Sequence, residues 1–101
     1  MNETETLIGT LLDDSWLTLE QLAAACAADV AWLEAHIEAG LLPQATSLGG
    51  VWRFSSATLR RARRLRQIER DFDAVPELAG LVADLIEEIE RLRAQLARHG
   101  L

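Results

Sequence analysis

The sequence predicts a mostly helical fold: a winged helix-turn-helix with a short β-hairpin, then an arginine-rich helix and a long C-terminal coiled-coil helix. Three observations predict it. Apolar residues follow helical spacing in four separate segments. A Gly49-Gly50 pair precedes a short stretch of alternating residues, as in a hairpin. Near the C-terminus, large apolar residues recur at alternating steps of four and three, which is typical of a coiled coil.

The chain divides into three parts on this basis. Residues 1–14 form an N-terminal arm, either partly ordered or added as a strand, because only a short apolar run breaks its acidic character. Residues 15–73 form the winged helix-turn-helix module, and residues 74–101 form the C-terminal dimerisation helix.

Two short helices are expected first. Thr18 and Gln21 have the spacing of a capping box, and the apolar residues after them place Cys26 toward the core as a small buried thiol. Asp29 is a suitable N-cap for the second helix, which runs to Ala39 before Gly40 ends it. Its inner stripe consists of Val30, Leu33 and Ile37.

The wing and the arginine-rich helix follow. Trp52 and Phe54 lie on the same face of the strand after the glycine turn, where both are expected to be structural. Ser55-Ser56 offers an N-cap for a helix that runs to about Phe72. Its apolar side is expected to be opposite its arginines, which are Arg60, Arg61, Arg63, Arg64 and Arg70, with Arg66 at one edge.

The last helix is predicted from Pro76 to about Arg98. Its apolar residues are Leu78, Val82, Leu85, Ile89, Leu92 and Leu96. Leu81 and Ile86 widen the first half, which is expected to pack on the body of the domain. The second half is expected to pair with another copy, with dimer contacts at Leu85, Ile89, Leu92 and Leu96. Helical ion pairs are expected between Glu87 and Arg91 and between Glu90 and Arg93.

Charge is distributed very unevenly along the chain. The net charge is −6; the first 50 residues hold eight acids and no cation, and all ten cations are arginines from Arg53 onward. This balance disfavours nucleic acid and favours a basic protein partner. No catalytic set, cofactor fingerprint or metal-ligand spacing occurs, so we expect no enzyme activity, no cofactor and no metal. Without a signal peptide or a membrane-spanning run, a cytoplasmic protein is expected.

The order of these parts resembles the MerR-type DNA-binding architecture, and Gly40-Leu41-Leu42-Pro43 is similar to the segment that follows its recognition helix. Where that family carries an Arg-Tyr-Tyr stretch, this chain has Glu34, Ala35 and His36. Where the family's wing carries a phosphate-binding arginine, this chain has Trp52. Two cations expected at DNA are therefore replaced by an acid and an indole.

A narrower resemblance fits these departures. The segments Trp52-Arg53-Phe54, residues 61–66 and residues 78–92 resemble the CbpM-type chaperone-modulator family. The resemblance implies a MerR-like layout that binds the J-domain of a DnaJ-like co-chaperone (CbpA) and inhibits its work with the DnaK chaperone. J-domains are known for a basic second helix, which the acidic first half of this chain would suit.

Several interpretations of individual residues stay open. Glu34 and Glu38, with Glu20 and Asp29, form either the partner-binding acidic face or an ordinary solvated one. Trp32 and His36 form either an exposed aromatic anchor or, for Trp32, a cover over the helix junction. The arginine-rich helix could face DNA, face a partner, or balance the acidic first half and Glu87, Glu88 and Glu90 across a dimer.

The functional expectation is a protein-binding inhibitor of a DnaJ-like co-chaperone that forms a homodimer. The alternatives are a MerR-like DNA-binding transcriptional regulator and a purely structural dimerisation module.

Overall fold

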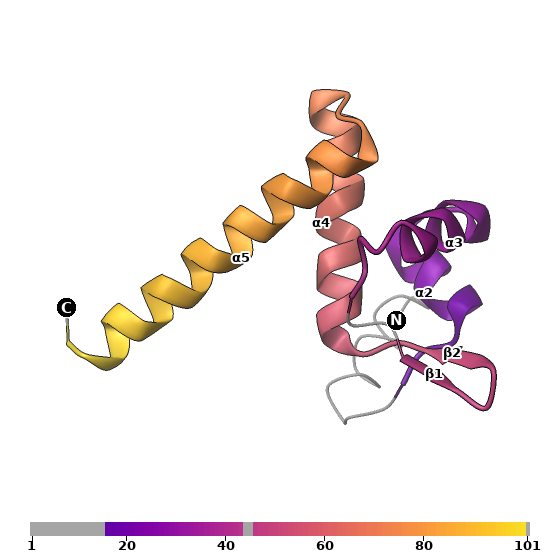
Figure 1. Cartoon of the computed structure of the whole chain (residues 1–101), viewed down its shortest axis with the longest axis horizontal. Coiled ribbons are helices and arrows are strands. Elements are labelled where there is room, and N and C mark those ends of the chain that lie inside the picture. Colours follow the sequence, from indigo (N-terminus) through magenta and orange to yellow (C-terminus); the bar gives the residue numbers. More distant parts are fainter. Residues whose placement is uncertain (1–15, 44–45, 101) are drawn as a thin grey trace, which may run out of the picture.

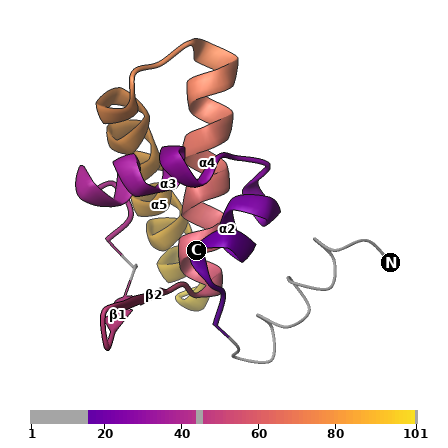
Figure 2. The same cartoon turned by 90° about the vertical axis from the view of Figure 1, so that its right-hand side faces the viewer.

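The computed structural model describes residues 16–43 and 46–100, so the predicted N-terminal arm lies outside the described residues. Helix α4 (Ser56–Phe72) lies at the centre (Figure 1). Helices α2 (Leu19–Cys26) and α3 (Val30–Glu38) lie on one side of it, and the long helix α5 (Pro76–Arg98) crosses another side and projects outward. Figure 2 shows the two short helices in front of both long ones. The predicted mostly helical class is confirmed.

Helix α2 begins with the predicted capping box. The Gln21 backbone N–H donates to Thr18 Oγ1 at 3.1 Å, and the Thr18 N–H donates to Gln21 Oε1 at 2.9 Å. These two bonds satisfy amide groups that would otherwise have no partner at the helix start. Cys26 is buried at the other end of α2, as its helical spacing predicts.

Helix α3 has the predicted position but a weaker start. Asp29 occupies the N-cap without a side-chain hydrogen bond, and Gly40 follows the helix with a φ of 75°, a conformation that glycine adopts without a steric penalty. Leu33 is fully buried, while Val30 and Ile37 are partly buried against the core. The stripe predicted for this helix therefore does face inward.

The hairpin consists of β1 (Thr46–Leu48) and β2 (Val51–Arg53), paired antiparallel. Leu48 pairs with Val51, so Gly49 and Gly50 form the turn. Both have positive φ values, as the two central residues of a type I′ hairpin turn require. Beyond β2, the backbones of Leu17 and Phe54 exchange two hydrogen bonds of 2.9 and 3.1 Å. This bridge joins the chain before α2 to the chain before α4.

The hydrophobic core lies where α2, α3 and the end of the hairpin meet α4. Its largest fully buried apolar side chains are Phe54, Leu17, Leu22, Leu33 and Leu65. The α4–α5 contact adds two alanines, Ala79 and Ala83, which are completely buried. The core is therefore dense around α4 but thin beneath α5.

Helix α5 starts at Pro76, as predicted, but packs on the body through a different face from the one expected. Its buried residues are Ala79, Gly80 and Ala83, and a Cβ atom on Gly80 would lie 2.7 Å from Leu41 Cδ2. Leu78, Leu81 and Leu85 are about half exposed. The first half of α5 thus packs on the body as expected, with Val82 and Ile86 partly buried against the core. The leucines of this half face outward instead, because the small residues let α5 approach the body closely.

The arginines of α4 also differ from the sequence prediction. Arg61 was expected on the solvent side, yet it is only 5% exposed. Its Nε donates to the Leu41 carbonyl at 2.6 Å, and its Nη1 contacts both Glu87 and Asp84 of α5. A charged residue is stable at such a position because these partners satisfy it.

Three acids of α5, Asp84, Glu87 and Glu90, pair with arginines of α4 rather than with α5 itself or a second chain. Glu87 contacts Arg61, and Glu90 receives two hydrogen bonds from Arg64, at 3.0 and 3.1 Å. Arg91 instead binds Glu88. The predicted helical pairs of Glu87 with Arg91 and of Glu90 with Arg93 are replaced by these contacts. For Glu87 and Glu90, charge balance is reached within one chain.

A larger side chain beneath α5 tests this packing. We expect Ala83→Leu to lower the free energy of unfolding by about 1–3 kcal/mol, because no space is left for three extra carbon atoms at a fully buried alanine. The measurement is urea unfolding at fixed protein concentration. The control is Ala94→Leu, at an exposed alanine of the same helix, with an expected change within about 0.5 kcal/mol. Equal stability of the two variants would contradict the packing of α5 through its small residues.

Candidate functional site

A shallow groove between α3 and β2 brings together residues that the sequence singled out separately. Its volume is about 130 Å³, and its lining residues are Glu34, Ile37, Glu38 and Trp52. Glu34 and Glu38 lie one turn apart on the outer side of α3, while Ile37 turns partly into the core. The groove therefore has an apolar floor next to two carboxylates. Glu20 and Asp29, the other members of the predicted acidic face, do not line it.

Trp52 is placed by its neighbour on the strand. Phe54 is completely buried, and the two rings stack with their centroids 6.3 Å apart, so the buried ring supports the indole. Trp52 itself remains 38% exposed. Of the two aromatics expected to be structural, Phe54 belongs to the core, whereas Trp52 is exposed beside the groove. The alternation of residues along β2 predicts that Trp52 and Phe54 share a face of the strand. It does not predict that Trp52 is exposed, because the edge of the core can fall between two residues on the same face.

The two carboxylates of the groove have no cationic partner among residues 16–43 and 46–100. Glu34 and Glu38 are exposed, and neither forms an ion pair with any residue in the described segments. A negative groove with an exposed indole suits a basic partner, because a tryptophan face binds both apolar side chains and cations. Two solvated carboxylates alone would provide little affinity.

Trp32 and His36 do not form the exposed anchor that was one of the interpretations. His36 is 4% exposed, and its ring stacks on Trp32 with 3.8 Å between centroids. Both residues bind Glu69 of α4: Trp32 Nε1 donates to Oε1 at 3.1 Å, and His36 Nε2 lies 2.7 Å from Oε2. The expectation of an exposed His36 is wrong, because a carboxylate 33 residues further along gives this side chain a buried partner. Trp32 covers the junction of α3 and α4, as the other interpretation held.

The surroundings of His36 show how firmly α3 is attached. Its second ring nitrogen, Nδ1, lies 2.7 Å from the Trp32 carbonyl oxygen. Both ring nitrogens of His36 are therefore within hydrogen-bond distance of an oxygen atom. Glu34 and Glu38 point outward from a helix whose opposite side is held in this way. The pair Trp32 and His36 therefore positions the groove but does not line it.

A second candidate surface runs along α5. Its residues, called the leucine face here, are each 45–56% exposed: Leu78, Leu81, Leu85, Ile89, Leu92 and Leu96. They include all four predicted dimer contacts and lie on the side of α5 opposite the small residues that pack on the body.

None of the helices in the described part of the chain is long and apolar enough to cross a membrane.

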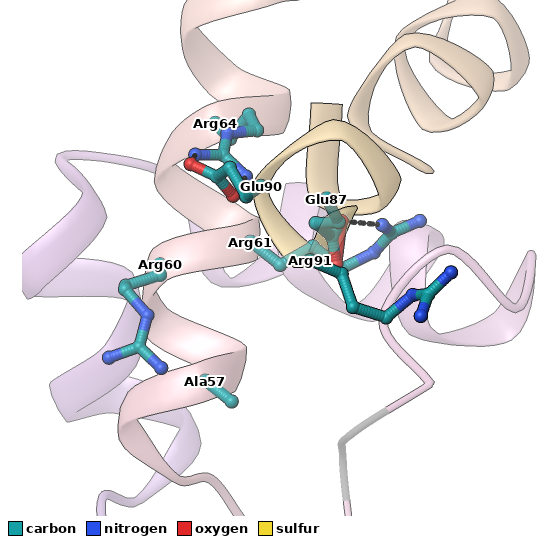
Figure 3. A pocket seen from close by; sticks show the side chains of 7 residues that line it. All are labelled: Ala57, Arg60, Arg61, Arg64, Glu87, Glu90 and Arg91. Carbon is teal, nitrogen blue, oxygen red and sulfur yellow. Dashed lines mark hydrogen bonds and ion pairs between the residues drawn. The ribbon is translucent and has the colours of Figure 1, made fainter. Parts of the chain in front are cut away.

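A cleft of about 430 Å³ between α4 and α5 has four arginines in its lining (Figure 3). Arg61, Arg64 and Arg91 are each bonded to a glutamate of α5, and Arg60 points away from α5 in Figure 3. The contacts of Arg61 and Arg64 attach α5 to α4, and that of Arg91 lies within α5. The cleft is therefore explained by the fold and offers little unsatisfied charge.

The thiol of Cys26 is also inert in its surroundings. Burial raises the pKa of Cys26 to about 11, although the positive charges of Arg63 and Arg66 act in the opposite direction. A thiol with this pKa is almost entirely protonated at neutral pH and is a poor nucleophile. This agrees with the sequence prediction of a small buried side chain.

Comparison with known proteins gave no relative. No protein-family model matches the chain, and neither the curated proteins nor the solved structures contain a match to it. The geometry of the surfaces and the resemblance of the sequence motifs therefore carry the functional argument.

The attachment of α3 can be tested at Glu69. We expect Glu69→Ala to lower the free energy of unfolding by about 2 kcal/mol, because it leaves the Trp32 indole N–H and the buried His36 ring without their partner. Urea unfolding at fixed concentration measures this. Asp71→Ala, at an exposed position two residues along the same helix, should change it by less than about 0.5 kcal/mol. If both variants behave alike, the Glu69 contacts do not hold α3.

Proposed function

We propose that this chain is a protein-binding modulator that inhibits a DnaJ-like, CbpA-type co-chaperone by binding its J-domain. The observation that carries the proposal is the groove between α3 and β2, where Glu34 and Glu38 lie beside the exposed indole of Trp52. The partner would insert basic side chains between the two carboxylates and place an apolar or cationic group on Trp52. The resemblance to CbpM-type modulators supports the choice of the J-domain, whose second helix is basic.

The arrangement of the elements supports a MerR-like winged helix-turn-helix. In this proposal α2 and α3 are the helix-turn-helix, β1 and β2 are the wing, and α5 is the dimerisation helix. The groove then lies between the recognition helix and the wing. A partner protein would bind at the surface that a DNA-binding relative uses for the duplex.

A MerR-like DNA-binding regulator is the second candidate, and the same surface argues against it. The groove presents two carboxylates without an ion-pair partner in the described segments, and polyphosphate would be repelled there. Of the arginines on α4, Arg61 and Arg64 already bind acids of α5. The residues that line the groove include no cation.

We also propose that the chain forms a homodimer through the leucine face. Six large apolar side chains, each about half exposed on one side of a helix, are an unusual surface for a monomer of this size. Pairing with a second copy would bury them without disturbing α4, because the body binds the opposite side of α5.

Reversing the charge of the groove tests the proposed partner. Glu34→Lys plus Glu38→Lys should weaken binding to a purified J-domain by roughly tenfold or more, since two attractive contacts become repulsive. Isothermal titration calorimetry measures the dissociation constant.

The matched control is Asp71→Lys plus Glu77→Lys, which changes the net charge equally at exposed acids outside the groove. We expect it to change binding by less than about threefold, through long-range charge alone. A J-domain that binds neither the wild type nor any variant would refute the proposal. Duplex DNA bound by the wild type with a steep salt dependence would favour the regulator instead.

Disrupting the leucine face tests the dimer. Leu85→Asp plus Leu92→Asp should give a folded monomer of 11.2 kDa, because these side chains are half exposed and do not support the body of the fold. Sedimentation equilibrium gives the mass and circular dichroism the helix content. As a control, Ala94→Asp plus Ala97→Asp introduces the same charges at exposed positions away from the leucine face and should leave a dimer. A wild-type monomer, or a dimer that survives the leucine changes, would contradict this surface.

A further inference from the structure

The arginines of α4 divide into two groups with different surroundings. Arg61 and Arg64 face α5 and form ion pairs with its acids. Arg60, Arg63 and Arg70 are exposed, and in the described parts of the chain no acid forms an ion pair with them. They recur at steps of three and seven along one side of the helix, over about 15 Å. Balance with the acids of α5 thus explains the first group only.

Beside the second group lies a hollow of about 340 Å³, called the arginine hollow here. Its lining residues are Ala25, Cys26 and Ala27 at the end of α2, and Arg63, Arg66, Gln67, Arg70 and Asp71 of α4. The α2 residues supply a small apolar wall, since Ala25 and Cys26 are buried. The α4 residues supply three guanidinium groups against one carboxylate.

Arg66 is held in place at this hollow. Its Nη2 donates to the Ala27 carbonyl oxygen at 2.8 Å, and its guanidinium lies 5.8 Å from the centre of the Trp32 ring. Its Nε is buried without a hydrogen-bond partner. A guanidinium that is already oriented loses little conformational entropy when it binds an anion. Arg63 and Arg70 stand beside it with their donors open to solvent.

We infer that the arginine hollow binds carboxylate side chains of an acidic segment in a partner protein. Planar guanidinium groups bind carboxylates with paired hydrogen bonds, and the distance from Arg63 to Arg70, about 10 Å along the helix, suits two or three acidic residues. The apolar wall of Ala25 and Cys26 accommodates their methylene groups. The hollow shares no residue with the groove of Glu34 and Glu38, so this inference is independent of the proposed function.

A polypeptide fits this surface better than a nucleic acid does. Nucleic-acid binding depends on many phosphate contacts at once, whereas the hollow offers three arginines and includes Asp71. The chain as a whole carries a charge of −6, which repels a long polyanion more strongly than a short acidic peptide.

The first test is binding of a fluorescent octaglutamate peptide to the full chain, followed by fluorescence anisotropy at low ionic strength. Arg63→Gln plus Arg70→Gln should weaken binding about fivefold, the effect of losing two solvent-exposed ion pairs. Arg93→Gln plus Arg98→Gln removes two exposed arginines at the far end of α5 and should change binding less than twofold. Equal weakening by both pairs, or no binding by the wild type at millimolar peptide, would overturn the inference.

The second test locates the bound peptide through backbone amides that line the hollow. Saturating octaglutamate should shift the amide resonances of Ala25, Ala27 and Gln67 in the proton–nitrogen correlation NMR spectrum, while octaglutamine at the same concentration should not. Unchanged resonances at these residues with bound octaglutamate would place the peptide elsewhere and refute the site. A DNA duplex that shifts the same resonances at lower concentration than the peptide would replace the acidic segment with nucleic acid.

Discussion

A buried arginine in the middle of α4 connects the parts of this fold that are far apart in sequence. Arg61 donates to the carbonyl of Leu41, just after α3, and pairs with Asp84 and Glu87 on α5. A guanidinium that is 5% exposed is stable only with such partners, so the contacts depend on one another. The fully buried residues of α5 are small, so the ion pairs of Arg61 and Arg64 add directional contacts between α4 and α5. Arg61 therefore contacts both the helix that carries the leucine face and the chain just after the helix that carries Glu34 and Glu38.

The structure explains part of the uneven charge distribution along the sequence. The acids of α5 neutralise the arginines of α4 that face them, so two strongly charged helices lie together at little electrostatic cost. The acids of α3 and the arginines of α4 beside α2 have no such neighbour among the described residues. The chain thus presents one acidic and one basic surface on different sides of its core. Net charge alone describes neither of them.

Local signals in the sequence predict the elements well, because caps and breakers act over a few residues. Thr18 with Gln21, Gly40, the Gly49-Gly50 turn and Pro76 all occur where the pattern places them. The errors concern side chains whose partners are distant in sequence. His36 and Arg61 are polar residues on helix sides expected to face outward, yet both are buried. His36 is paired with a carboxylate 33 residues away and Arg61 with one 26 residues away. The apolar spacing of α5 predicts the helix, but spacing does not reveal which side of it faces the body, since alanine and glycine can pack more closely than leucine.

The two backbone bonds between Leu17 and Phe54 close a loop that contains α2, α3 and the hairpin. Both walls of the acidic groove, α3 and β2, belong to this loop. Closing a loop of this length costs conformational entropy before its contacts form. The groove is therefore complete only when this loop is closed. A ligand that contacts both walls of the groove binds only the closed loop and therefore stabilises it against opening.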